Sequence, residues 1–196
     1  MFMRRFSAIL LLLCFSLPAI AQESENSPEL IRIDRNHSTM GFNVPIVKGL
    51  SKVTGKFTDF SIDLIWDEAN LDASSVQLVI QVESIDTGIE ARNKHLKTAD
   101  FFDVEQFPTI TFNSSSIQKS GDGFDVQGTY TMHGVSKEVT LPLTLKTFTS
   151  EEGQTWTAFR VNYVIDRTDY GMNWKHNIAD FFVGNEIEAD IVLLTR

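Results

Sequence analysis

The amino-acid sequence predicts an all-β fold, an antiparallel sandwich or barrel. Three observations support this prediction. Apolar and polar residues alternate with a period of two over most of the chain. Short turn signals separate the alternating runs. The composition is that of one ordinary globular domain, because the chain has 196 residues, of which 42% are hydrophobic and 22% are charged.

The alternating runs place their apolar side chains on one face of each expected strand. Strands are expected within the ranges 40–44, 53–57, 60–64, 76–82, 110–112, 124–132, 139–145, 159–165 and 187–193. Turns are expected at 121–123, 133–136 and 151–153, and the first of these, Gly-Asp-Gly, is typical of a β-hairpin. The chain has no internal repeat, linker or low-complexity tract.

One segment lacks strand alternation and is predicted to be helical. It runs from Glu90 to Lys97, with Thr87 as the N-cap. Glu90 follows Thr87 by three residues, which is the spacing of a capping box. A compact aromatic loop, residues 101–108, comes next. The sequence therefore predicts one helical excursion from the sheet.

The expected helix carries the densest cationic patch of the chain, R-N-K-H-L at residues 92–96. Arg92 and His95 are three residues apart and share a helix face. That face could pair with a carboxylate, Asp86 or Asp103. It could instead meet an anionic or carbonyl-bearing ligand head group. The spacing does not decide between these.

The first residues have the layout of a secretory signal peptide. A short positive start precedes an apolar run at 9–17, and Ala19 and Ala21 form an A-x-A cleavage site. The apolar run is too short to span a bilayer, so an uncleaved anchor is the weaker alternative. Removal would take the only Cys, Cys14, and with it any disulfide or thiolate. The predicted division is a removed signal peptide at 1–21, a flexible leader at 22–29 and one β domain at 30–196. Stable membrane insertion of the mature protein is not expected.

Charge and motifs exclude several classes of function. The net charge of −9 argues against a nucleic-acid binder and against docking on anionic membranes. The sequence has no G-x-S-x-G, no phosphate loop and no dinucleotide fingerprint. The four His residues do not have the spacing of a metal site. No catalytic residue, metal or cofactor is therefore expected.

The inward positions of the expected strands are rich in Phe. In a small barrel, such residues either fill the interior or line one ligand cavity. Periodicity does not separate these outcomes, and by itself it favours a packed core.

Six motifs, in order along the chain, resemble those of the YceI family. They are D-x-x-H-S at 34–38, V-x-G-x-F at 53–57, S-I-D-T at 84–87 with R-N-K-H-L at 92–96, D-F-F-D at 100–103 leading into F-P-T-I-T-F at 107–112, G-T-Y-T-M-H-G-V-S-K at 128–137, and R-T-D-Y-G-M at 167–172. Together they cover nearly all of residues 30–194. The chain departs from the family pattern at Tyr130, where Leu is usual, at Tyr170, where Phe is usual, and in the loop 174–177.

The resemblance implies an extended, eight-stranded, lipocalin-like antiparallel barrel. It places the excursion from Thr87 to Phe107 near one opening of a hydrophobic tunnel. The tunnel would take one chain-like lipid, such as a polyisoprenoid, an isoprenoid quinone, or a fatty acid or amide. If Tyr130 or Tyr170 faces the tunnel, the ligand end nearby is more polar than in relatives.

The favoured function is a periplasmic carrier or reservoir for such a lipid, with a polyprenyl chain or quinone as the bound ligand. A homodimer is compatible with this function. The alternatives are a structural or stress-response partner protein with a filled barrel and, less favoured, an enzyme that uses His95 or His133 on a bound lipid. The expected ligand-binding residues are Phe42, Phe57, Leu78, Ile80, Arg92, His95, Phe101, Phe107, Phe112, Tyr130, Leu143 and Phe159.

Overall fold

The computed structural model describes residues 30–195. The predicted signal peptide and leader lie outside the described residues. Within this range, no helix is long and apolar enough to cross a membrane.

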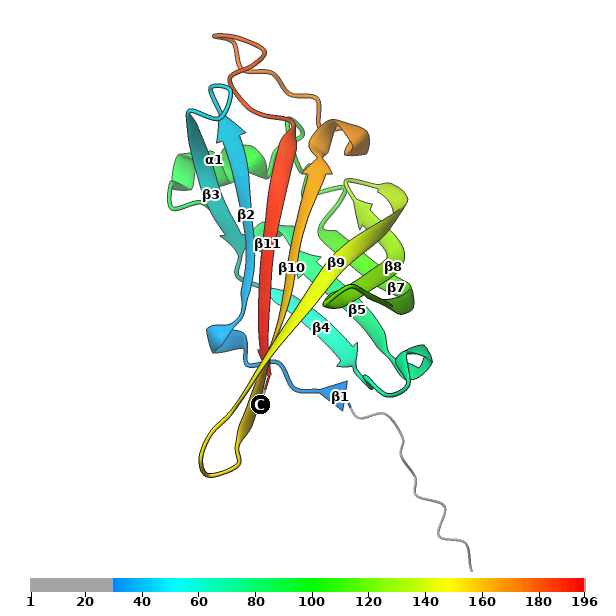
Figure 1. Ribbon diagram of the computed structural model, residues 1–196. Coiled ribbons are helices and arrows are strands. Elements are labelled where there is room, and N and C mark those ends of the chain that lie inside the picture. Colours follow the sequence, from blue (N-terminus) through cyan, green and yellow to red (C-terminus); the bar gives the residue numbers. More distant parts are fainter. Residues whose placement is uncertain (1–29, 196) are drawn as a thin grey trace, which may run out of the picture.

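The described chain forms one antiparallel sheet that curls around a hydrophobic interior (Figure 1). Within residues 30–195 the sheet has eleven strands, in the order β1-β4-β5-β7-β8-β9-β10-β11-β2-β3-β6. The strands are β1 (Leu30–Ile31), β2 (Thr39–Ile46), β3 (Ser51–Phe57), β4 (Phe60–Ile65), β5 (Ser75–Gln81), β6 (Ile85–Asp86), β7 (Thr109–Ser120), β8 (Gly123–Met132), β9 (Val135–Thr149), β10 (Thr155–Asp166) and β11 (Glu186–Thr195). The helical segments are α1 (Glu90–Leu96) and the short 3-10 turns η1 (Arg35–His37), η2 (Leu71–Ala73), η3 (Val82–Ser84) and η4 (Arg167–Tyr170).

The two ends of the sheet meet at a corner made of bent strands. β3 continues into β4 through Thr58 and Asp59, and β5 continues into β6 through η3. β3 pairs with β6, and β4 pairs with β5. The Thr58 amide donates to the Ser84 carbonyl at 3.2 Å, and the Gln81 amide donates to the Asp59 carbonyl at 2.9 Å. With β3–β4 and β5–β6 each counted as one bent strand, and β1 left out, the described sheet has eight strands, as the resemblance implied.

The three expected turns are confirmed. β7 and β8 join through Gly121 and Asp122, and Gly121 has a φ of +57°. β8 and β9 join through His133 and Gly134, with φ of +49° and +74°. Positive φ at both central residues matches the right-handed twist of the paired strands. Residues 150–154 connect β9 to β10.

The helix is confirmed, but its predicted N-cap is wrong. α1 begins at Glu90 after Ile89, and no side chain caps it. Thr87 is turned to other partners, because its amide and hydroxyl both donate to Asn93 Oδ1, at 2.9 and 2.6 Å. Gly88, with a φ of +77°, reverses the chain between Thr87 and the helix. The helix therefore starts at the predicted residue, but Ile89 and not Thr87 occupies the N-cap position.

The two ends of the barrel differ in what they carry (Figure 1). The mouth end, at the top of the figure, carries α1, the β2–β3 turn at residues 47–50 and the β10–β11 loop at 171–185. The closed end carries β1 and the β9–β10 hairpin. At the closed end Trp66 packs edge-on against Phe124 and Phe159, with ring centroids 4.8 and 5.5 Å apart.

Candidate functional site

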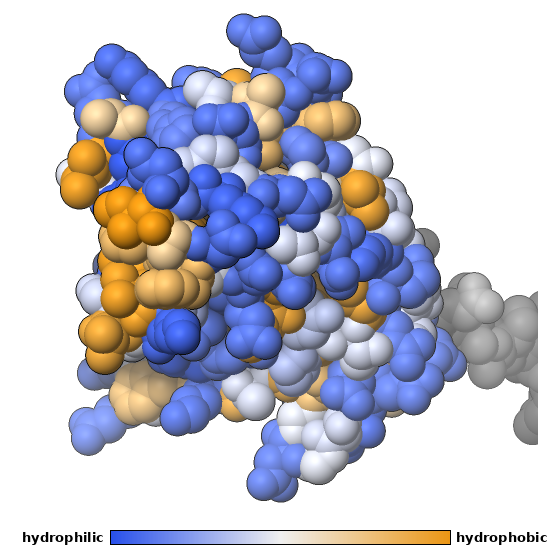
Figure 2. All heavy atoms as spheres, turned by 90° about the horizontal axis from the view of Figure 1, so that it is seen from above, coloured by the Kyte–Doolittle hydropathy of each residue, from blue (hydrophilic) through white to orange (hydrophobic). Residues whose placement is uncertain are grey.

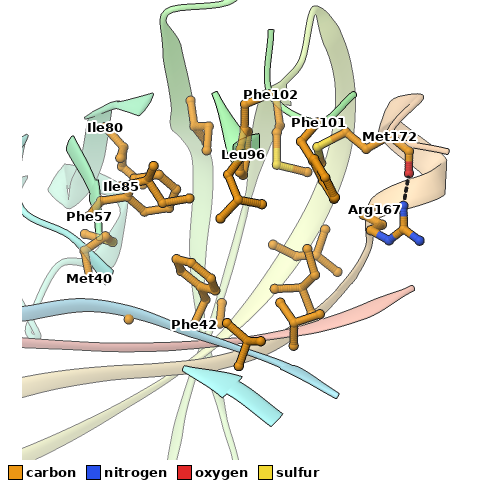
Figure 3. A pocket seen from close by; sticks show the side chains of 18 of the residues that line it. Met40, Phe42, Phe57, Ile80, Ile85, Leu96, Phe101, Phe102, Arg167 and Met172 are labelled. Atoms are coloured by element: carbon orange, nitrogen blue, oxygen red, sulfur yellow. Dashed lines mark hydrogen bonds between the residues drawn. The ribbon is translucent and has the colours of Figure 1, made fainter. Parts of the chain in front are cut away.

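A cavity of about 460 Å³ lies inside the barrel toward the mouth end. Its walls are the inward-facing side chains of nine strands, together with α1 and the loops that follow α1 and η4 (Figure 3). Most of the lining is aliphatic or aromatic. An apolar space of this size inside the barrel suits a hydrophobic ligand, because burying apolar surface is favourable in proportion to its area.

Two glycines allow large rings to lie along the walls. The ring of Phe42 on β2 covers Gly55 on β3, where a Cβ would collide with it. The ring of Phe112 on β7 covers Gly128 on β8 in the same way. Phe42 also contacts Phe57, with ring centroids 5.5 Å apart. The motifs at 53–57 and 128–137 thus contribute to the shape of the cavity wall as well as to the strands.

The cationic face of α1 points to the mouth of the cavity. Arg92 and His95 both line it, as does Leu96. His95 Nε2 lies 2.8 Å from Asp100 Oδ2. Arg92 donates to the hydroxyl of Thr87 at 2.8 Å and to its carbonyl at 2.7 Å. The site therefore places a guanidinium and an imidazole beside an otherwise apolar opening.

Neither carboxylate considered from the sequence pairs with this face. Asp86 accepts from the Gly88 amide at 2.8 Å and from Asn93 Nδ2 at 3.3 Å. These two hydrogen bonds, in that order of importance, lower the pKa of Asp86 below its usual value. Asp103 accepts instead from Gln106. The chain reversal at residue 88 turns Asp86 toward the helix start and away from Arg92.

Buried Arg167 organises the loop on the other side of the mouth. Its guanidinium donates to the carbonyls of Met172, Trp174 and Gly184 and to Asn185 Oδ1. Removal from water lowers the pKa of Arg167, and nearby Asp166 opposes this effect. The residues that this network positions include Met172, which lies beside Arg167 in Figure 3, and Trp174. Both line the cavity. An Arg at the end of an apolar strand, within R-T-D-Y-G-M, was the sequence signal for this role, but it was not among the expected site residues.

Aromatic rings link the two sides of the mouth. Trp174 lies 5.3 Å from the ring of His95 and 5.0 Å from that of Phe101, centroid to centroid. His176 stacks on Phe182 at 4.3 Å, and both line the cavity. The loop 174–177, noted as a departure from the family pattern, therefore does form part of the opening.

Two tyrosines, Tyr130 and Tyr163, belong to the otherwise apolar wall. Tyr130 lines the cavity, and its hydroxyl donates only to the thioether of Met132, at 3.5 Å. Burial raises the pKa of Tyr130, so the phenol stays protonated. Tyr170 is buried outside the lining, with its ring edge-on to Tyr130 at 5.6 Å, and burial raises its pKa to about 12. Of the two tyrosines that depart from the family pattern, only Tyr130 changes the cavity surface.

The cavity brings together nine of the twelve expected ligand-binding residues. The nine that line it are Phe42, Phe57, Leu78, Ile80, Arg92, His95, Phe101, Phe112 and Tyr130. Their role in binding stays a prediction.

The other three expected residues lie outside the lining, so their predicted position is wrong. Phe107 packs under the β8–β9 turn, against Gly134 and the ring of His133. Leu143 is buried opposite Phe124, and Phe159 packs against Trp66. The contacts of Leu143 and Phe159 fill the barrel toward the closed end, where a separate hollow of about 180 Å³ includes Trp66 and Phe159. The cavity therefore does not extend through the barrel as a tunnel.

The two candidates for acid–base chemistry have different surroundings. His133 Nδ1 lies 2.9 Å from the Tyr170 carbonyl oxygen, and His133 does not line the cavity. His95 lines the cavity, and its ring is hydrogen-bonded to the exposed Asp100. Among residues 30–195, no three His, Cys, Asp or Glu come together as metal ligands.

Comparison with known proteins identifies relatives along the whole described domain. Residues 32–194 match the family model of the YceI-like domain. Protein YceI of Salmonella arizonae is 39% identical over 112 residues, which span 56% of this chain and 58% of that protein. The matched part is thus little more than half the length of the curated relatives.

Solved structures share the fold. BcnA of Burkholderia cenocepacia has a TM-score of 0.73 at 24% identity, covering 84% of this chain and all of that one. A polyisoprenoid-binding domain from Saccharophagus degradans has a TM-score of 0.60 at 18% identity, covering 86% of this chain and 99% of that one. At these identities the likeness shows the fold alone.

Proposed function

The chain belongs to the YceI-like family, and we propose that it binds one long-chain lipid in the cavity and carries or stores it in the periplasm. The lipid class is a polyisoprenoid, an isoprenoid quinone, or a fatty acid or amide. The apolar cavity inside the barrel is the observation that carries the proposal. The polyisoprenoid-binding description of a structural neighbour supports it. The signal-peptide layout of residues 1–21 supports export.

The hydrophobic effect is large enough for such a role. Each buried methylene contributes about 0.8 kcal/mol, so about ten methylenes contribute about 8 kcal/mol before the losses of binding entropy. A free energy near −8 kcal/mol corresponds to a Kd on the order of 1 μM. A longer chain therefore gains further free energy from burial, which offsets the conformational entropy that it loses on binding.

The polar end of the lipid is placed at the mouth in this proposal. Arg92 and His95 supply donors there, whereas deeper walls are almost wholly apolar. A head group at the mouth keeps its contact with water while the chain is buried, which avoids the penalty for an unpaired buried polar group. The helix that bears these residues is fixed to the barrel through Thr87.

The test is native mass spectrometry of protein from its native compartment, followed by lipid extraction and identification. We expect a stoichiometric adduct of lipid mass. The variant Ala189→Trp adds a large ring to the lining and should lose the adduct, because the cavity is filled. Ala158→Trp, on the neighbouring strand but outside the lining, is the matched control and should keep it. An apo mass that persists after incubation with candidate lipids would overturn the proposal.

A further inference from the structure

We propose that the mouth end docks on the surface of a phospholipid bilayer, so that lipid passes between bilayer and cavity without crossing water. This inference rests on the proposed lipid-binding function. The docking surface is the mouth rim, defined as Leu50, Ile178 and Phe181. The three residues belong to two loops of the mouth end (Figure 1).

The rim exposes large apolar side chains at loop positions where folding does not require them. Leu50, in the β2–β3 turn, is 85% exposed, and Ile178 is 72% exposed. Phe181 is also exposed. In the view onto the mouth end, apolar residues gather along one side of the surface (Figure 2). Large apolar side chains on loop tips suit insertion into the boundary between head groups and acyl chains.

The two loops of the rim form one connected surface. The Val47 amide donates to the Phe182 carbonyl at 2.9 Å, and the Gly184 amide donates to the Pro45 carbonyl at 2.8 Å. The ammonium of Lys48 lies 4.9 Å from the ring centroid of Phe181. These contacts hold the turn at 47–50 beside the loop 171–185.

The rim leads directly into the cavity. Phe182 and Val183, which follow the exposed Phe181, line the cavity. On the other loop, Ile46 lines it, four residues before Leu50. A lipid chain that leaves the cavity at this side therefore meets the rim first. A partner that accepts or supplies such a chain must itself be apolar below its surface, and a bilayer is.

Local charge also fits a phospholipid surface. Residues 39–57, which form β2, β3 and the turn between them, contain Lys48, Lys52 and Lys56 and no Asp or Glu, although the whole chain carries a net charge of −9. Positive side chains beside an apolar tip are attracted to lipid phosphates. In a two-fold pairing of copies through the rim, the same hairpins would face each other with like charge. The bilayer is therefore the favoured occupant over a second copy of the chain.

The experiment is co-sedimentation with vesicles of phosphatidylcholine containing a minor fraction of phosphatidylglycerol. We expect the native protein to bind. The variant Leu50→Ser/Ile178→Ser/Phe181→Ser should lose binding by about tenfold or more, because binding scales with the apolar area inserted. Phe148→Ser is the matched control, since Phe148 is 66% exposed on the β9–β10 hairpin of the closed end. This control should bind as the native protein does.

A second variant tests the charge contribution separately. Lys48→Glu/Lys52→Glu should weaken binding at low salt and have a smaller effect at high salt, because screening removes the head-group attraction. If native protein does not sediment with vesicles, or if the Ser variant binds as the Phe148→Ser control does, the docking proposal is overturned. A concentration-dependent dimer that the Ser variant abolishes would also overturn it, in favour of a second copy as occupant.

Native mass spectrometry of the same variants separates the two proposals. All the rim changes lie outside the cavity lining, so each variant should keep its co-purified lipid while transfer of that lipid to vesicles slows. If the native protein holds lipid but does not bind vesicles, the docking proposal is refuted and the lipid-binding proposal is not. Absence of lipid in the native protein would refute the proposed function, whatever the vesicles show.

Discussion

The two ends of the barrel use the same alternation of apolar residues for opposite purposes. At the closed end, Trp66, Phe124 and Phe159 meet edge to face and fill the interior. At the mouth end, the rings of Phe42 and Phe112 lie along the walls over glycines and leave about 460 Å³ between them. The aromatic content is high in both regions. The difference is that the rings of the closed end pack on one another, whereas two rings of the mouth end also lie over glycines.

The comparison shows why a filled barrel and a ligand cavity are not exclusive alternatives. Packing at the closed end can stabilise the fold without help from a ligand, since well-packed aromatic cores contribute several kcal/mol per large side chain. The mouth end is then free to leave space unfilled. The expected filled barrel describes the closed end, and the expected cavity describes the mouth end.

The largest effect is expected from a change at the closed end. Phe159→Ala should lower the free energy of unfolding by about 3–5 kcal/mol, because it opens a void among buried rings. Phe42→Ala should cost less than about 2 kcal/mol, because the Phe42 ring already borders a cavity. Urea unfolding of lipid-free protein measures both, since bound ligand would stabilise the folded state. Equal losses would mean that the two ends are packed alike.

A smaller effect is expected from the loop that closes one side of the mouth. Arg167→Lys keeps the charge but loses the fork that reaches four acceptors, and we expect a loss of about 1–3 kcal/mol. Limited trypsin digestion should cut faster after Lys175, which lies in the loop that Arg167 holds. Asp169→Asn, which removes only an exposed partner of Lys137, is the control and should leave the cleavage rate unchanged. Unchanged cleavage in Arg167→Lys would show that the loop is held by other contacts.

Much of the fold was predictable from the sequence. Period-two alternation and Gly-containing turns depend on neighbouring residues, so they locate the strands and hairpins directly. Two features were missed because they depend on contacts that the alternation pattern does not contain. The bends at residues 58–59 and 82–84 let one sheet close at a corner. The N-cap was misassigned because the Thr87 side chain binds Asn93, inside the helix, and not the amides of the first turn.

The site was only partly predictable, for a related reason. Alternation shows that Leu143 and Phe159 face inward, as Leu78 and Phe112 do, but it carries no information about depth along the barrel. Depth depends on the stagger of strands and on which large side chains meet across the interior. The position of Trp66 near the closed end decides that Phe159 is packed. Arg167 was missed because its four acceptors come from a loop with no regular pattern.

A third change tests the Tyr130 hydroxyl in the cavity wall. Tyr130→Phe should weaken binding of a lipid that places an oxygen acceptor beside this residue by about three- to tenfold, because one neutral hydrogen bond contributes about 0.5–1.5 kcal/mol. Binding of a chain without such an oxygen should not change. Tyr170→Phe is the control, because its hydroxyl lies outside the lining. Burial raises the pKa of Tyr130, so the native preference should stay constant between about pH 5 and 9. If Tyr130→Phe and Tyr170→Phe bind every lipid equally, the hydroxyl does not select the ligand.

The smallest effect is expected at acid pH, in the network that fixes α1 to the barrel. Asp86 accepts hydrogen bonds from Gly88 and Asn93, which lower its pKa in the folded state. A carboxyl with a lowered folded pKa stabilises the fold above its unfolded pKa of about 3.9, and this contribution is lost as pH falls through the folded value. Asp86→Ala should therefore speed amide hydrogen exchange in α1 at neutral pH, where the native carboxylate holds the helix start.

The same comparison at low pH makes the test specific. Once Asp86 is protonated in the native protein, its stronger, charge-assisted bonds are lost, and the exchange rates of native protein and variant should converge. Strands at the closed end, which the network does not touch, should show no difference at either pH. The exposed Asp122 in the β7–β8 turn offers a control, since Asp122→Ala should not alter exchange in α1. A difference that persisted unchanged in acid would mean that Asp86 acts through packing rather than charge, and the pH sensitivity of the mouth would have to arise elsewhere.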